Sequence, residues 1–271
     1  MAKQKFLFVT HKIHPYLPVE ESTLGKNMPQ KIASAGYEVR TFMPKFGLVN
    51  ERRNQLHEVI RLSGINIPIN NNDHPLVIKV ASLQPSRIQV YFIDNDDYFT
   101  KSADDEDPLG SNRPDNDERA IYFAHGTADT VKKLKWEPSL VHVSGWITSL
   151  LPLYIRNLYS NDTTYLNSKV IYSVLPGNIT GGVDAKIFDK LSDEGFEEVL
   201  IERYKTQKAD TNLFHYIAID NSDAVIFHTP EPPAHLLNLA EEKNMPILRF
   251  EDLDEDGKAI TDFYKKLTNE E

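Results

Sequence analysis

The sequence contains no cysteine among its 271 residues, which excludes disulfide bonds and thiolate metal ligands. It has no run near the roughly 20 apolar residues that a membrane-spanning helix needs. Only a short apolar run, residues 6–9, follows Lys3 and Lys5, and it is too short for an export signal. Positive charge is also scarce, since 30 Lys and Arg residues stand against 40 acidic ones and the formal net charge is −10. These features argue against a nucleic-acid or membrane surface, and we expect a cytoplasmic protein.

What is present is the composition of a soluble globular domain: 40% of the residues are hydrophobic and 26% are charged. We find no internal repeat and no linker long enough to separate two domains. A chain of this length can bury one large core. We therefore predict a single domain over residues 1–271.

Short apolar runs alternate with longer amphipathic stretches, a pattern typical of a mainly parallel α/β sheet. Strands are predicted at residues 5–10, 38–42, 76–81, 87–93, 140–143, 169–174, 224–227 and 246–250. Helices are predicted near residues 22–35, 115–135, 146–159, 194–208, 232–243 and 258–267. Residues 65–74 predict a hairpin or exposed turn, and residues 101–117 an irregular surface loop.

Residues 140–155 predict a buried strand, a sharp turn and a helix. This stretch resembles the matching part of bacterial glycogen and starch synthases. The shared positions are Val141, His142, Trp146, Pro152, Leu153 and Tyr154. The polar centre differs, because Ser144, Gly145 and Ile147 stand where that family carries His, Asp and His.

Further matches to this family follow in the same order along the chain. Residues 5–10, Pro15 and residues 32–44 resemble its first βαβ unit, with Gly36 as the helix C-cap. Later matches are residues 90–94, Tyr98, Phe99, residues 115–119, Tyr122, Phe123, residues 170–174 and residues 222–227.

The resemblance implies a Rossmann-like, doubly wound, mainly parallel sheet, similar to the N-terminal half of a GT-B glycosyltransferase. In such enzymes the N-terminal domain receives the growing glucan and the C-terminal domain holds most of the sugar nucleotide. The whole chain resembles the N-terminal domain alone. We therefore expect no C-terminal donor domain within these residues.

Two further family motifs are altered. The family's Lys-Thr-Gly-Gly-Leu loop, which meets phosphates, corresponds to residues 16–26, with Pro18 near the lysine position and Glu20 and Glu21 at the two glycines. Proline removes an N–H donor and two carboxylates repel a diphosphate. Lys26 could reach that place, although its position suits a helix surface. The family's His-Asn pair is replaced by Leu175 and Pro176.

A ligand crevice is still expected at the carboxyl edge of the sheet, where α/β folds bind their ligands. His11 and His14 directly follow the first predicted strand, and a plain polar loop is the alternative for them. His142 lies inside a strand and is read either as a functional group or as a satisfied core histidine. Ser144 and Gly145 predict an open turn that could hold an anion, and Trp146 packs the strand–helix junction. The candidate crevice residues are His11, His14, Lys26, His142, Ser144, Gly145 and Trp146.

Altered motifs on a retained framework favour a glycogen/starch-synthase-like protein without independent transferase activity, which binds a glucan, a small ligand or a protein. The alternative is a glycosyltransferase half-enzyme that moves glucose from a nucleotide sugar to an α-glucan and is completed by a partner subunit or a homodimer. A third hypothesis is an unrelated enzyme that uses His11, His14 and Ser144. Neither a metal nor a cofactor is expected.

Overall fold

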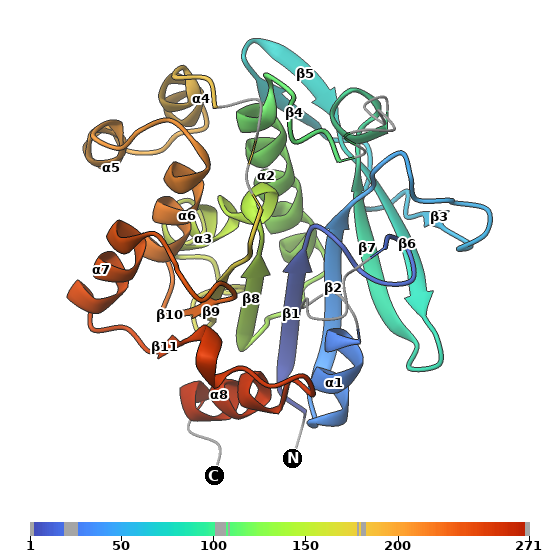
Figure 1. Ribbon diagram of the computed structural model, residues 1–271. Coiled ribbons are helices and arrows are strands. Elements are labelled where there is room, and N and C mark those ends of the chain that lie inside the picture. Colours follow the sequence, from blue (N-terminus) through green and yellow to red (C-terminus); the bar gives the residue numbers. More distant parts are fainter. Residues whose placement is uncertain are drawn as a thin grey trace.

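The computed structural model describes residues 3–18, 27–100, 107, 109–177, 179 and 183–268 (Figure 1). The strands are β1 (Lys5–Thr10), β2 (Glu38–Pro44), β3 (His57–Glu58), β4 (Asn66–Ile69), β5 (Asn72–Pro75), β6 (Val77–Leu83), β7 (Ile88–Asp94), β8 (Leu140–Ser144), β9 (Lys169–Val174), β10 (Ala224–Phe227) and β11 (Ile247–Leu248). The α-helices are α1 (Met28–Ser34), α2 (Asn116–Lys133), α3 (Leu151–Arg156), α4 (Ile187–Asp193), α5 (Glu198–Lys205), α6 (Thr211–Asp220), α7 (Ala234–Glu242) and α8 (Lys258–Thr268). A π-helical turn spans Asp96–Thr100 and a 3-10 turn spans Trp146–Thr148.

One large sheet forms the centre of the molecule. Within the described residues its strand order is β11-β10-β9-β8-β1-β2-β7-β6-β3. Strands β11 to β7 in this order are parallel to their neighbours, whereas β6 and β3 add an antiparallel edge. The predicted mainly parallel, Rossmann-like sheet is confirmed. The predicted hairpin is confirmed too, as β4 and β5 pair in a separate two-stranded sheet.

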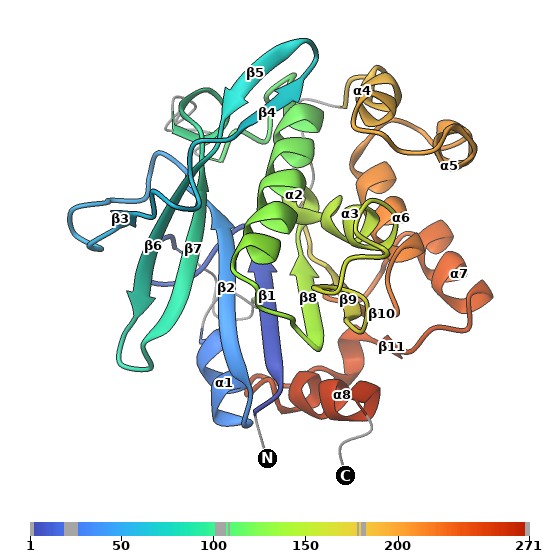
Figure 2. The ribbon, with the colours of Figure 1, turned by 180° about the vertical axis from the view of Figure 1, so that it is seen from behind.

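Helices cover both faces of the sheet, as a doubly wound fold requires. Helices α2 and α3 lie over β1 and β8 on one face (Figure 2), and α1 and α8 lie on the other, near the amino ends of the strands (Figure 1). Burial on both faces explains why all five residues of β8 and all four of β10 are buried. None of the described helices is both long and apolar enough to cross a bilayer.

The predicted helix at residues 146–159 is shorter than expected. Residues Trp146–Thr148 form a 3-10 turn, and α3 begins only at Leu151. Pro152 explains the break, because proline has no N–H to donate and is tolerated only in the first turn of a helix. The helix predicted at residues 22–35 is described only from Met28 to Ser34, since residues 19–26 lie outside the described part.

Helices α4 and α6 and strand β3 were not predicted. Helix α4 is held to α2 by a buried ion-pair cluster centred on Lys190. The Lys190 ammonium lies 2.6 Å from Asp117 Oδ2 and 2.8 Å from Glu118 Oε1. Burial raises the pKa of Asp117, and Lys190 opposes that shift. The buried carboxylate of Asp117 therefore depends on the lysine for its charge compensation.

Replacing Lys190 with methionine should leave Asp117 buried and unpaired, at a cost of about 3–5 kcal/mol in the free energy of unfolding. Lys205→Met is the matched control, because Lys205 makes exposed ion pairs with Glu198 and Glu202 on α5. Urea unfolding of both variants checks this expectation. Equal effects of the two substitutions would contradict it.

Candidate functional site

The carboxyl ends of β1 and β8 define the site. From β1 the chain builds β2 and β7 on one side, and it then returns through α2 to β8 on the other side. Thr10 at the end of β1 pairs with Ser144 at the end of β8. The loops that follow these strands diverge there, which leaves the crevice where doubly wound folds bind ligands.

A crevice of about 280 Å³ opens at this point. It is lined by His11, Lys12, Asp107, Leu109, Ser111, Gly145, Trp146, Leu175, Pro176 and Gly177. The lining thus comes from four segments: the loops after β1, β8 and β9, and the segment that precedes α2. It mixes charged, aromatic and small residues.

His11 packs directly on Gly145. A Cβ atom built on Gly145 would lie 2.9 Å from Cε1 of the imidazole and closer still to Nδ1. Gly145 has φ 88° and ψ 161°, a backbone region that essentially only glycine adopts. Nδ1 of His11 is buried and has no hydrogen-bond partner in the described part of the chain. Glycine at position 145 therefore lets the imidazole form the floor of the crevice.

The charge of the crevice comes from Lys12 and Asp107 rather than from His11. Burial lowers the pKa of His11 to about 4, the charge of Lys12 acts in the same direction, and the Ser144 backbone offsets them only in part. The imidazole is consequently neutral at pH 7. Burial alone would raise the pKa of Asp107, but hydrogen bonds from Asn112 and Ser111 outweigh it and hold that pKa below its ordinary value.

Arg119 on α2 fixes the segment that brings Leu109 into the lining of the crevice. Its guanidinium is fully buried and donates hydrogen bonds to the carbonyls of Tyr98, Leu109 and Gly110, at 2.7–2.8 Å. It also lies 5.9 Å from the ring centroid of Trp146, which is half-buried. One cation therefore contacts both the segment that carries Leu109 and the indole of Trp146.

The structure brings only part of the predicted set together. His11, Gly145 and Trp146 line the crevice, whereas His14 is exposed and does not contribute to the lining. Ser144 is buried behind the crevice, with Oγ 3.5 Å from the Val9 carbonyl. Of the turn expected at Ser144 and Gly145, Gly145 therefore lines the crevice and the Ser144 side chain does not. Lys26 lies outside the described residues.

His142 is a hydrogen-bonded core residue. Its Nδ1 lies 2.6 Å from the Tyr264 hydroxyl of α8, and its Nε2 lies 2.7 Å from Ser173 Oγ. Ser173 Oγ in turn lies 3.1 Å from Nε2 of His228. Burial, with a smaller contribution from His228, lowers the pKa of His142 to about 3. Of the two interpretations of His142, the geometry supports the satisfied core histidine.

The replaced family positions do not fill the crevice in the same way. Ile147 is buried away from it and Pro18 is exposed, whereas Gly145, Leu175 and Pro176 contribute to the lining. The crevice is accordingly open and partly polar.

Asp107, Leu109 and Ser111 were missed as site residues. They belong to the region predicted as an irregular loop, and their place depends on contacts with Arg119. The one signal in the sequence was the family match at residues 115–119, which includes this arginine.

No group of three or more His, Asp or Glu side chains that could hold a metal ion occurs among the residues that the structure describes. Several acidic residues of the loop at 101–106 lie outside that part of the chain.

The fold and the crevice define a Rossmann-like domain with a crevice at its topological switch point. The sequence profile of the starch synthase catalytic domain matches residues 5–231. The chain belongs to this family, which fits the resemblance seen in its sequence.

Relatives and a solved structure agree with this assignment. Glycogen synthase of Chlorobium luteolum is 31% identical over 223 residues, which cover 81% of this chain and 44% of that protein. Glycogen synthase of Chlorobium phaeobacteroides is 34% identical over 200 residues, covering 72% and 40%. The chain spans less than half the length of these relatives. The catalytic domain of starch synthase IV from Arabidopsis thaliana, bound to ADP and acarbose, superposes with a TM-score of 0.70 at 14% identity, over 92% of this chain and 51% of that one.

The contact between His11 and Gly145 predicts a specific pattern of stability. Gly145→Ala should lose about 1–3 kcal/mol from backbone strain and more from the overlap with His11. Gly177→Ala is the control, because Gly177 also has a positive φ, of 112°, but nothing lies within 4 Å of an added Cβ. In the double variant Gly145→Ala with His11→Ala, the share of the stability loss that comes from the overlap should be recovered. Thermal unfolding of the four proteins checks this, and equal effects at the two glycines without rescue would refute it.

His142 should make stability depend on pH. The ordinary pKa of an unfolded histidine is about 6.5, so below that pH the unfolded chain takes up a proton that folded His142 refuses down to about pH 3. Its contribution to stability is therefore complete above pH 6.5 and is lost as the pH falls, by up to about 1.4 kcal/mol per pH unit.

Urea unfolding between pH 7 and pH 4 tests this, since His142→Gln should reduce the slope of stability against pH. Tyr264→Phe is the control: it removes one hydrogen bond to the imidazole, so it should lower stability while preserving the slope. An unchanged slope in His142→Gln would show that His142 is not responsible.

Proposed function

We propose that this chain binds an α-glucan in the crevice at the ends of β1 and β8 and has no independent glucosyltransferase activity. Its family membership and its glycogen synthase relatives support a glucan as the ligand. The structurally similar starch synthase IV domain was solved with acarbose and ADP, which supports a ligand at this kind of crevice. Fold alone does not carry the activity over, so the proposal depends on the residues that line the site.

Glucosyl transfer from a nucleotide sugar requires positive charge for the departing diphosphate and polar groups placed at the reacting carbon. A general acid or base works best when its pKa lies near the working pH. His11 and His142 have pKa values lowered to about 4 and about 3, and the second is enclosed in the core. Ser144 is buried as well.

The observation that carries the proposal is this pairing of an open crevice with histidines held neutral. Trp146 and Leu175 present apolar surface, and an indole face suits the C–H face of a sugar ring. The neutral imidazole of His11 can donate or accept a hydrogen bond from a hydroxyl group. These groups bind a saccharide without activating it.

One observation favours the alternative, glucosyl transfer once a donor-binding domain covers the crevice. Lys12 lines the crevice and has no ion-pair partner in the described part of the chain. Such a cation is suited to a diphosphate. The domain that covers it would be a partner subunit or a second copy of the chain.

The test is to incubate the purified chain with ADP-glucose or UDP-glucose and a maltooligosaccharide primer, and to measure glucose incorporation and glucan binding separately. We expect binding without turnover. Trp146→Ala should weaken binding by about tenfold or more, because it removes the aromatic surface. His14→Ala, an exposed change outside the crevice, should leave binding unchanged.

Turnover that Lys12→Ala abolishes would overturn the first proposal and establish catalysis in this crevice. If turnover occurs only when a second protein is added, the half-enzyme alternative is supported. Unchanged glucan binding in the Trp146→Ala variant would show that the crevice is not the glucan site.

A further inference from the structure

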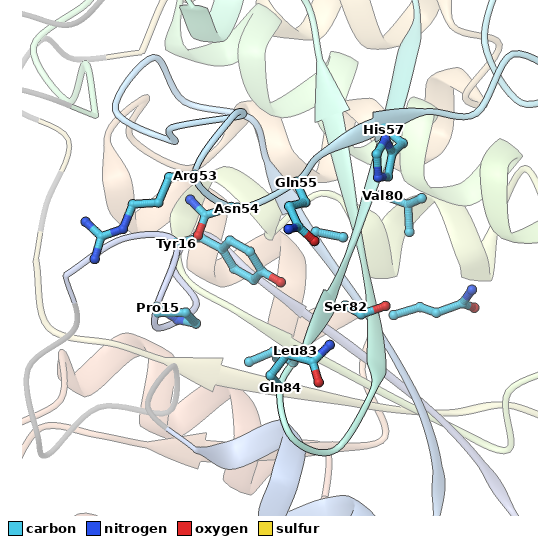
Figure 3. A pocket seen from close by; sticks show the side chains of 12 residues that line it. Pro15, Tyr16, Arg53, Asn54, Gln55, His57, Val80, Ser82, Leu83 and Gln84 are labelled. Atoms are coloured by element: carbon cyan, nitrogen blue, oxygen red, sulfur yellow. The ribbon is translucent and has the colours of Figure 1, made fainter.

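A second hollow lies at the antiparallel edge of the sheet, away from the crevice. Its volume is about 520 Å³, within the range of about 300–1,000 Å³ for small-molecule pockets. Its walls are the loop after β1, the segment before and within β3, strand β6 and the start of β7. We call it the edge pocket (Figure 3).

Tyr16 supplies the aromatic wall of the edge pocket. The residue is only 6% exposed, and its ring packs edge-to-face on Phe92 with centroids 5.0 Å apart. Burial raises the pKa of its hydroxyl to about 12, so the group stays protonated. A tyrosine this deeply buried normally hydrogen-bonds within the protein. The Tyr16 hydroxyl has no such partner in the described part of the chain, and Figure 3 shows it pointing into the hollow.

The remaining polar wall consists mainly of amides. Gln55 and Gln84 line the pocket from two different segments, and their side-chain amides make no hydrogen bond to any described residue. The NH₂ group of Asn54 donates a hydrogen bond to the Asn50 carbonyl, so the side-chain oxygen of Asn54 is left to accept one from a ligand. An amide side chain carries a donor and an acceptor side by side. That arrangement matches neighbouring hydroxyl groups, each of which also donates and accepts.

No carboxylate occurs among the described residues that line the edge pocket, although the chain has 40 acidic residues. Arg53 is the one residue of its lining that carries a permanent charge, and its guanidinium points away from the other labelled side chains (Figure 3). Apart from Arg53 and the imidazole of His57, the lining is neutral and rich in paired donors and acceptors. Such a lining selects a neutral ligand with many hydroxyl groups over an anion.

We propose that the edge pocket is a second saccharide-binding site, in which the Tyr16 hydroxyl and the side-chain amides of Gln55 and Gln84 hydrogen-bond the hydroxyl groups of the sugar. It goes beyond the glucan site proposed for the crevice, and the two linings share no residue. They are joined through one loop, since His11 and Lys12 line the crevice and Pro15 and Tyr16 line the edge pocket.

The experiment is a calorimetric titration of the full chain with maltotriose. Two binding events per chain are expected. Gln55→Ala with Gln84→Ala should weaken one of them by about tenfold or more, since each lost hydrogen bond costs several-fold in affinity. Trp146→Ala should weaken the other. Asn238→Ala, which removes an exposed amide on α7, is the control.

Tyr16→Phe tests the hydroxyl separately and should weaken the same event as the two glutamine substitutions, while circular dichroism confirms that the variant is folded. Inorganic phosphate should not compete with maltotriose for binding. Arg53→Ala should leave the affinity for maltotriose within about twofold of that of the unaltered chain.

The outcomes separate the two sites. If the double glutamine variant keeps both binding events, the edge pocket is not a saccharide site, whatever the crevice does. If Trp146→Ala keeps both while the glutamine variant loses one, the crevice proposal fails and the edge pocket stands. Displacement of maltotriose by phosphate would overturn the inferred preference for a neutral ligand.

Discussion

The parallel pairing of β1 with β8 is the constraint on which the rest of the structure depends. It sets Thr10 beside Ser144. The residues that follow them, His11 and Gly145, are thereby brought into direct contact. That contact requires glycine at position 145, both for its backbone angles and for the space that His11 occupies. The crevice is therefore a product of the sheet register, and its floor is an imidazole packed on a bare backbone.

Much of the fold follows from local sequence patterns. Strands β1, β9 and β10 have the bounds that their apolar runs predict, because a strand buried on both faces is written as consecutive apolar residues. Helix α6 was not predicted, because it is buried on most sides and its sequence therefore shows little amphipathic periodicity. Strand β3 has two exposed residues and no apolar signal at all.

The site was predicted less completely than the fold. Adjacency to a strand end was enough to find His11, Gly145 and Trp146. The alternation of side chains along β8 places Ser144 on the same face as His142, and since the strand continues to Ser144, that hydroxyl is buried. The position of Leu109 depends on the guanidinium of Arg119, ten residues further along the chain. A local sequence pattern does not predict which groups such a long side chain contacts.

The buried histidines of this protein have properties that differ from those of histidines in a site for proton transfer. His142, His215 and His228 all have pKa values lowered to between about 3 and about 4 by burial, and each is hydrogen-bonded to a hydroxyl group of the core. A histidine in this state contributes hydrogen bonds to stability, but protonating it at neutral pH would oppose folding. The imidazoles of these three residues thus serve packing, and Lys12 is the cation among the described residues that line the crevice. Buried neutral histidines beside a crevice that holds one described lysine support binding of a ligand there. Any chemistry in the crevice would depend on charged groups that a ligand or a partner brings.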